Sequence, residues 1–170
     1  IEAVLTAEPG GDGVGNAIRE LLLDPQKLIY PRAELLLFEA ARAQHVDSVI
    51  KPALDRSAFV ICDRFADSST AYQGYGRKID ISILKMLNEF AASGLKPDIT
   101  FLLDLPVEAG LKRQKKMDRI SSEEMDFHES VRKGFLEIAG SEPERYVIIN
   151  ALEPLDAVYD KAVISINSRR

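Results

Sequence analysis

Three things are scarce in this sequence: cysteine, an excess of positive charge, and long apolar runs. The single cysteine, Cys62, excludes an internal disulfide and indicates a reducing compartment, which we expect to be the cytoplasm. The formal net charge of −5 argues against a general nucleic-acid-binding surface. No apolar run approaches the roughly 20 residues that span a bilayer, and the opening residues do not resemble a signal peptide. We therefore expect neither a membrane partner nor a nucleic-acid partner.

What is present is typical of one globular domain. The 170 residues are enough for a sizeable core, and 46% hydrophobic and 29% charged residues are ordinary proportions. Short apolar stretches read as strands at 3–6, 58–62, within 98–105, and at 146–150. Since they alternate with helical stretches, we predict an α/β fold, a three-layer sandwich whose parallel sheet is flanked by helices.

The helical stretches lie between these strands. They are expected at 14–23, 32–56, 68–74, 81–92, 106–116, 123–138 and 154–167. Pro52 should kink or interrupt the long second helix, because proline lacks the N–H that an α-helical turn uses.

The segment 63–77 follows a buried strand and has the composition of a binding site. Asp63 could orient a metal ion or its water, and Arg64 could pair with a phosphate through two hydrogen bonds. The hydroxyl and amide groups that could serve a nucleotide are those of Ser68, Ser69, Tyr72 and Gln73. In open α/β sheets ligands bind at the carboxyl ends of strands, where this segment begins. The alternative is a helix N-terminus capped by Asp63, with Arg64 in a surface ion pair.

A second candidate lies on the predicted helix 32–56. Phe38 and Arg42 are four residues apart and share one helix face. A flat ring beside a guanidinium suits a nucleobase, although Phe38 taken alone is better explained as a core residue. Arginine is rarely buried without a partner, so Arg42 needs either an acidic neighbour or a ligand. His45, one turn further, is expected to be structural.

The third candidate is the basic stretch 112–119, which has five positive charges and one negative charge. Such a stretch can neutralise charge on a transferred phosphoryl group. It is also explained as a solvated helix end that complements the helix dipole. Arg119 stands out, since it follows Asp118 and lies beyond the run of lysines.

Together these segments closely resemble the bacterial thymidylate kinase family. The matching stretches are AEPGG at 7–11, PRAELLLF at 31–38, ARAQHV at 41–46, IKPAL at 50–54, CDR at 62–64, AYQG at 71–74, KPD at 96–98, LLDLP at 102–106 and DRI at 118–120. The resemblance implies a P-loop nucleoside-monophosphate kinase that transfers the γ-phosphoryl group of ATP to dTMP. It implies Mg²⁺ as cofactor, dTMP and ATP as partners, and a homodimer. No protein nucleophile is needed, because positioning and charge neutralisation carry the catalysis.

The resemblance also implies roles for particular residues. Phe38 would stack on thymine, and Arg42 would hydrogen-bond its edge. Arg64 would hold the dTMP phosphate, flanked by Glu8 and Pro9. The base and sugar pocket would be lined by Ser68, Ser69, Tyr72 and Gln73. Arg113 and Arg119 would belong to a lid over ATP, at about 112–122, and would be catalytic together with Arg64. Asp63 is the candidate metal ligand, through water or directly.

Two departures from the family pattern matter. Residues 1–170 read as a single kinase domain without the first strand, the P-loop and the first helix, so we expect the chain to be part of a longer one. The lid is also a few residues short near 117–118, which leaves the roles of Lys115 and Lys116 open. The alternatives are a non-catalytic dTMP-binding module without an ATP cradle, and a kinase for another nucleotide such as dUMP.

Overall fold

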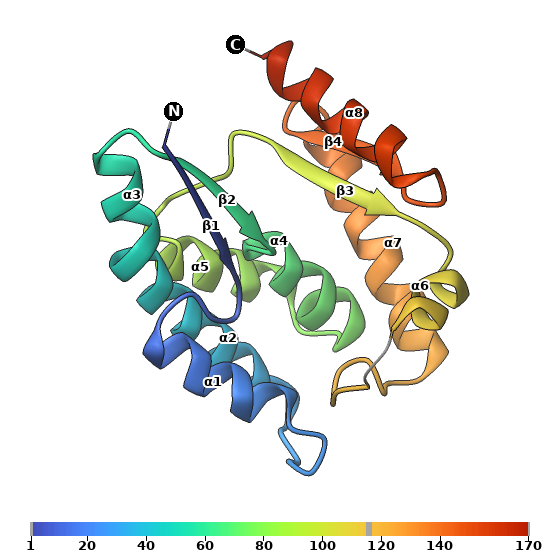
Figure 1. Ribbon diagram of the computed structural model, residues 1–170. Coiled ribbons are helices and arrows are strands. Elements are labelled where there is room, and N and C mark those ends of the chain that lie inside the picture. Colours follow the sequence, from blue (N-terminus) through green and yellow to red (C-terminus); the bar gives the residue numbers. More distant parts are fainter. Residues whose placement is uncertain (1, 115–116, 170) are drawn as a thin grey trace.

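The computed structural model describes residues 2–114 and 117–169, and Figure 1 labels its elements. The strands are β1 (Ala3–Ala7), β2 (Phe59–Asp63), β3 (Thr100–Asp104) and β4 (Tyr146–Asn150). The α-helices are α1 (Gly13–Leu23), α2 (Pro31–His45), α3 (Lys51–Asp55), α4 (Ala66–Ser69), α5 (Ile81–Ala91), α6 (Val107–Arg113), α7 (Met125–Ser141) and α8 (Leu155–Asn167). Two π-helical segments, η1 (Val46–Ile50) and η2 (Thr70–Gly76), continue α2 and α4. The predicted strands and helices are confirmed, with small shifts of their ends; the last two residues of the predicted helix 106–116 lie outside the described residues.

The strands pair in parallel, as predicted, but they form two pairs. β1 pairs with β2 in the register Ala3 to Phe59, and β3 pairs with β4 in the register Thr100 to Tyr146. Within residues 2–114 and 117–169, no hydrogen bonds join the two pairs into one sheet. The α/β class is therefore confirmed, while the sheet itself runs as two separate parallel ladders.

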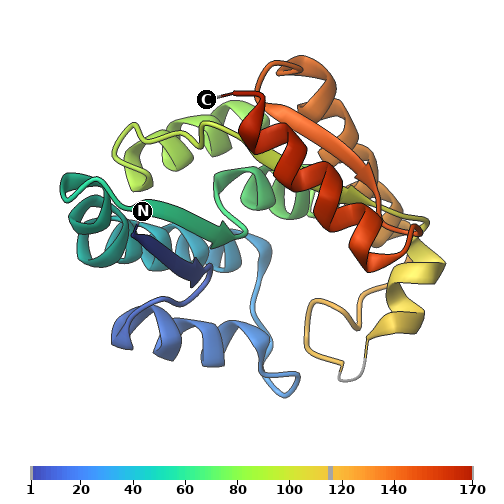
Figure 2. The same cartoon turned by 45° about the horizontal axis from the view of Figure 1, so that its top comes forward.

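Helices hold the two strand pairs together. Figure 2 shows β1 and β2 beside α1, α2 and α3, while β3 and β4 lie beside α7 and α8. The helical segment η2, which follows β2, packs closely on α7, which precedes β4. A cluster of buried apolar side chains lies where η2 and α7 meet. That cluster contains Ala71, Phe127 and Val131, with Tyr72, Ile120, Phe135 and Ile138 packed against it.

The long second helix is interrupted where the sequence predicts it. Its α-helical hydrogen bonds give way at η1, where the N–H of Lys51 donates to the carbonyl of Val46, five residues back. Pro52 follows directly and has no N–H to donate. α2, η1 and α3 thus form one helical stretch with a π-helical turn at the proline.

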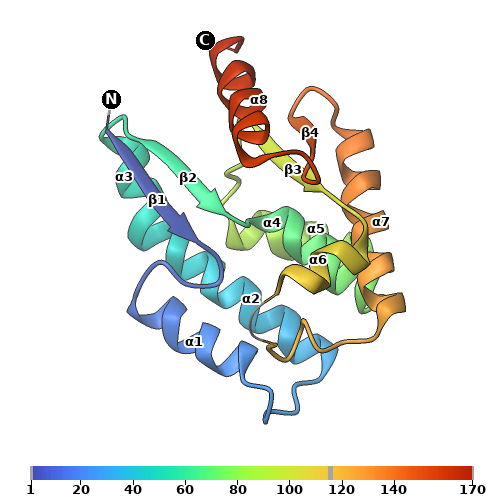
Figure 3. The same ribbon diagram turned by 45° about the vertical axis from the view of Figure 1, so that its right-hand side comes forward.

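The segment after α6 returns towards the first helices. Figure 3 shows residues 117–124 of this connection below α6, near the end of α2. The N–H of Arg119 donates to the carbonyl of Leu23 at the end of α1, with an N···O distance of 3.2 Å.

Among the described residues, no helix combines the length and the apolar character needed to cross a membrane.

Candidate functional site

A cavity of about 340 Å³ lies at the carboxyl ends of β1 and β2. Glu8 and Pro9 follow β1, Asp63 ends β2, and all three line the cavity. Every residue predicted to bind substrate contributes to the lining: Glu8, Pro9, Phe38, Arg42, Arg64, Ser68, Ser69, Tyr72 and Gln73. Segments that are distant in sequence therefore meet at one site, as expected for an open α/β sheet.

Arg64 is held at the cavity with its guanidinium available. Its backbone has a φ of 70°, a left-handed conformation that is uncommon for residues other than glycine. Its guanidinium lies 5.3 Å from the centre of the Tyr72 ring, and no hydrogen-bond or ion-pair partner for it occurs in the described part of the chain. An exposed cation over an aromatic face, without a protein counter-ion, is suited to bind an anion.

The alternative view of this segment, a helix cap and an ion pair, is wrong. Phe65, and not Asp63, stands at the N-cap of α4, and no side chain from the described residues caps that helix. The Asp63 carboxylate is exposed and has no hydrogen-bonding or ionic partner among residues 2–114 and 117–169. Both charged side chains are therefore free to meet a ligand at the end of β2.

Buried Arg42 was expected to need either an acidic neighbour or a ligand, and the structure gives it acidic neighbours. Its Nε donates to Glu8 at 2.8 Å, and its Nη1 donates to both oxygens of Glu39 at 2.8 Å and to Asn88 at 2.7 Å. Its Nη2 donates to Ser69 at 3.1 Å. Burial alone would lower the pKa of Arg42, but Glu8 and Glu39 raise it, so the guanidinium stays charged. By donor count, one N–H on Nη2 is left for a ligand in the cavity.

His45 has a structural role, as expected. It is fully buried, its Nδ1 lies 2.9 Å from Glu8, and its Nε2 lies 2.6 Å from the Thr6 hydroxyl. Because a carboxylate only accepts hydrogen bonds, Nδ1 carries a proton, and in the neutral imidazole Nε2 then accepts from the Thr6 hydroxyl. His45 therefore positions Glu8, whose other oxygen accepts from Arg42.

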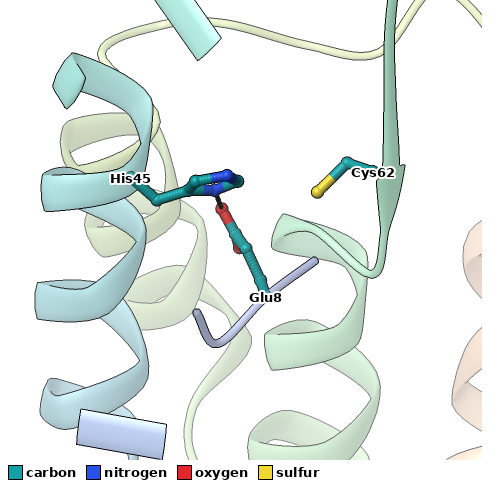
Figure 4. A group of neighbouring side chains, drawn as sticks. All are labelled: Glu8, His45 and Cys62. Atoms are coloured by element: carbon teal, nitrogen blue, oxygen red, sulfur yellow. Dashed lines mark hydrogen bonds and ion pairs between the residues drawn. The ribbon is translucent and has the colours of Figure 1, made fainter. Parts of the chain in front are cut away.

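Glu8, His45 and Cys62 form a close group whose potential ligand atoms all lie within 4.8 Å of one another (Figure 4). Such a set could hold a metal ion if its atoms were available. However, Glu8 and His45 are already hydrogen-bonded, and the Cys62 thiol donates to the carbonyl of Arg64 at 3.0 Å. Burial, together with the charges of Glu8 and Asp63, raises the pKa of Cys62 to about 12. The group therefore fits a hydrogen-bonded support for the cavity, and it does not fit a metal centre.

Glu34 is a buried acidic residue to which the sequence assigned no role. Its carboxylate is buried and accepts from Gln73 at 2.9 Å, from Arg77 at 3.0 and 3.1 Å, and from Arg119 at 2.6 Å. Burial raises the pKa of Glu34, but the hydrogen bonds from Arg77, Gln73 and Arg119 outweigh it and hold that pKa below its ordinary value. A glutamate in the apolar first half of α2 was the available signal.

The two predicted lid arginines lie outside the lining of the cavity. Arg119 donates through Nε to the carbonyl of Leu22 at 2.7 Å and through Nη1 to Glu34, while its buried Nη2 has no partner among the described groups. Arg113 is exposed and donates to the carbonyl of Ala151 at 2.9 Å. Lys115 and Lys116, whose roles the sequence left open, lie outside the described residues.

Several lining residues had not been predicted. They are Arg19, Leu23, Phe65, Gln114, Asp118, Ile120, Ser121 and His128. Arg19 donates to the carbonyl of Pro9 at 2.9 Å, which places a second cation at the cavity. His128 comes from α7, and nothing in its local sequence indicates that α7 borders this site.

The fold and the cavity define an α/β protein whose small-molecule site lies at the carboxyl ends of parallel strands. The family model described as Thymidylate kinase matches residues 1–162. A thymidylate kinase of Desulfovibrio desulfuricans is 49% identical over 168 residues, covering 92% of this chain and 77% of the relative. A thymidylate kinase of Lactobacillus acidophilus is 44% identical over 172 residues, covering 98% and 80%.

A solved structure agrees with these sequence matches. The crystal structure of thymidylate kinase from Ehrlichia chaffeensis superposes with a TM-score of 0.79 at 36% identity, covering 97% of this chain and 80% of that one. The chain belongs to the thymidylate kinase family.

Proposed function

We propose that this protein transfers the γ-phosphoryl group of ATP to dTMP, giving dTDP and ADP on the route to dTTP. The observation that carries the proposal is the unpaired Arg64 guanidinium, which shares one cavity with Phe38, Tyr72 and Gln73. An anion site beside aromatic and amide groups suits a nucleoside monophosphate. Membership of the thymidylate kinase family supports the same reaction.

The acceptor phosphate would lie against the basic end of the cavity. Arg64 and Arg19 would supply charge-assisted hydrogen bonds, and Pro9 and Glu8 would form the adjoining wall. Holding the phosphate oxygen in line with ATP is the main contribution required of the protein, because the acceptor oxygen is itself the nucleophile.

The nucleoside would occupy the aromatic end of the cavity. Phe38 would stack on thymine, and the remaining N–H of Arg42 together with Ser69 and Gln73 would meet its edge. Tyr72 and Ser68 would lie against the deoxyribose, where the Tyr72 ring would disfavour a ribose. We propose dTMP as the preferred substrate over dUMP, and comparing turnover of the two nucleotides tests that preference.

Mg²⁺ fits the residues present at the mouth of the cavity. Asp63 offers an exposed carboxylate without a protein partner in the described part of the chain, and carboxylate oxygens are the ligands Mg²⁺ prefers. When bound, the ion would supply charge neutralisation for the ATP phosphates.

On the ATP side we propose Arg113 and Arg119, in the segment 112–122, as the lid groups that neutralise charge on the transferred phosphoryl. We further propose that the protein acts in the cytoplasm as a homodimer.

The direct test is ATP- and Mg²⁺-dependent conversion of dTMP to dTDP by the purified protein. Turnover is expected, and Arg64→Gln should lower kcat/KM by about 10- to 100-fold, since losing a hydrogen bond to a charged group costs about 1.5–3 kcal/mol. Lys133→Gln is the matched control, because Lys133 is exposed on α7 and, within residues 2–114 and 117–169, pairs only with Glu137. Binding of dTMP without turnover would instead favour a non-catalytic dTMP-binding module.

A further inference from the structure

The side-chain amide of Gln73 is held in one orientation. Gln73 is buried on η2 and lines the cavity, and its Nε2 donates to Glu34 at 2.9 Å. An amide carries its donor and its acceptor on opposite sides of one carbon, so fixing the nitrogen also fixes the oxygen. The Gln73 side-chain oxygen has no hydrogen-bond partner among residues 2–114 and 117–169, which leaves it available to a ligand.

Glu34 can impose this orientation because it only accepts hydrogen bonds. Its Oε1 accepts from Gln73 at 2.9 Å and from the Nε of Arg77 at 3.1 Å, while its Oε2 accepts from the Nη2 of Arg77 at 3.0 Å and from Arg119 at 2.6 Å. The two guanidinium groups keep the buried carboxylate ionised, in line with its lowered pKa. A protonated or neutral group at this position could donate a hydrogen bond. The side-chain amide of Gln73 could then flip and exchange the positions of its oxygen and nitrogen.

We infer that Glu34 is a positioning residue that selects the base: it turns the Gln73 carbonyl oxygen towards the nucleobase, where it accepts only from a base with a ring N3–H. Thymine and uracil carry that hydrogen, whereas the N3 of cytosine is an acceptor and would face another acceptor. This inference rests on the proposed function, because it assigns specificity within the same cavity. A site whose buried polar group is left unpaired rejects the wrong ligand strongly.

The test compares two ligands that differ only at this edge of the base. 5-Methyl-dCMP keeps the methyl group, sugar and phosphate of dTMP, but replaces N3–H and O4 with N3 and an amino group. Dissociation constants of both nucleotides are measured by titration calorimetry, without ATP, for the wild type and for Glu34→Gln. The matched control is Glu123→Gln, because Glu123 also pairs with Arg77, at 2.6 Å, but does not contact Gln73.

The wild type is expected to prefer dTMP, and Glu34→Gln should reduce that preference by about tenfold, which corresponds to about 1.4 kcal/mol. Glu123→Gln should keep the wild-type preference within about threefold, or about 0.7 kcal/mol. A folded Glu34→Gln protein with an unchanged preference would overturn the inference while leaving the kinase function standing. A wild type that neither binds nor phosphorylates dTMP would overturn both.

A measurement on the unmodified protein covers the case in which Glu34→Gln does not fold. With ¹⁵N-labelled glutamine, the Gln73 amide protons should be protected from exchange before dTMP is added, because one of them is bonded to the buried Glu34 carboxylate. The amide proton that is bonded to Glu34 should remain bonded there when dTMP binds. Protons that exchange freely, or that move to the base on binding, would overturn the inference.

Discussion

Arg42 and Arg64 both line the cavity, but only Arg42 also holds buried parts of the fold together. Arg42 is buried and bonded to Glu8, Glu39, Asn88 and Ser69, whereas Arg64 is exposed and contacts a tyrosine ring. Replacing Arg42 would leave Glu8 and Glu39 as buried carboxylates without a counter-ion, which is strongly destabilising. Replacing Arg64 removes only an exposed charge, so its effect on dTMP turnover reports binding and catalysis directly.

Glu34 should make the stability of the protein depend on pH in the acidic range. Its pKa is lower in the folded protein than in the unfolded chain, so its ionised form stabilises the fold. That contribution is fully present above the ordinary glutamate pKa of about 4.3, and it is lost as the pH falls through the lower folded value. At pH 7, Glu34→Gln should lower the free energy of unfolding by about 3 kcal/mol, since it removes the buried carboxylate that pairs with both Arg77 and Arg119.

Urea unfolding at pH 7 and at successively lower pH values measures this effect. The gap between the wild type and Glu34→Gln should narrow as the pH falls, because the wild type progressively loses the same interaction. Glu144→Gln, which changes an exposed glutamate, controls for the general loss of negative charge. A gap that stays constant with pH would show that Glu34 does not stabilise the fold through its charge.

Individual site residues could be predicted where several of them lie close together in the sequence. Arg64, Ser68, Tyr72 and Gln73 follow one strand end, so a single segment indicated a site, and Phe38 lay on an adjoining helix. Glu34 could not be assigned in this way, because its partners Gln73, Arg77 and Arg119 lie 39, 43 and 85 residues away. Its place in an apolar stretch of sequence indicated a buried charge, but it could not indicate which residues that charge would meet.

At the scale of elements, η2 connects the cavity to the core. Gln73 and Tyr72 line the cavity, while Ala71 and Tyr72 also pack against Phe127 and Val131 of α7. The N–H of Arg77 donates to the carbonyl of Tyr72, five residues back, at 2.9 Å. A π-helical turn of this kind shifts the register of the helix, and such turns are frequent at functional sites.

The close approach of η2 to α7 depends on a glycine. A Cβ on Gly134 would lie 2.6 Å from the ring of Tyr75, too close for any real contact. Gly134→Ala should therefore destabilise the protein by about 1–3 kcal/mol, as overpacking in a core does, and should weaken dTMP binding as η2 moves. Thermal unfolding and dTMP titration measure the two effects.

Gly140→Ala is the control on the same helix. A Cβ at Gly140 meets nothing within 4 Å, so alanine there should stabilise α7 by up to about 1 kcal/mol through its helix propensity. If Gly134→Ala proved as stable as Gly140→Ala, the packing of η2 on α7 would not be as tight as the structure indicates.

The helices and strands were largely predictable, because their hydrophobic periodicity and the glycines and prolines at their ends are features of the local sequence. Pro52 indicated the interruption after α2, and the apolar runs indicated all four strands. The π-helical turns were not predictable, since an α-helix and a π-helix share one pattern of side chains over so few residues. The extension of α7 to Ser141, three residues beyond its predicted end, likewise depends on its packing against η2, β3 and β4.

At the scale of the whole molecule, the cavity is assembled from both strand-pair sides. Glu8 and Asp63 come from the ends of β1 and β2, while His128 comes from α7, which packs on β3 and β4. The sequence predicted parallel strands and a site at their carboxyl ends, because those follow from general rules of α/β folds. It could not assign the pairing of β1 with β2 and of β3 with β4, which depends on contacts across the chain.

The exposed apolar side chains of α2 and α5 predict that the protein associates with itself. Leu36, Ile83, Met86 and Phe90 are exposed at 56%, 47%, 62% and 84%, although the two helices pack on each other and Asn88 of α5 bonds Arg42 of α2. The same helices thus support the cavity and present apolar side chains to solvent, as a homodimer interface would. We expect a dimer in light scattering, and Phe90→Asp should convert it to a folded monomer, because burying an unpaired carboxylate is unfavourable. Tyr159→Asp, at a 65% exposed aromatic residue on α8, should remain dimeric. A monomeric wild type, or a Phe90→Asp protein that stays dimeric, would remove α5 from the interface.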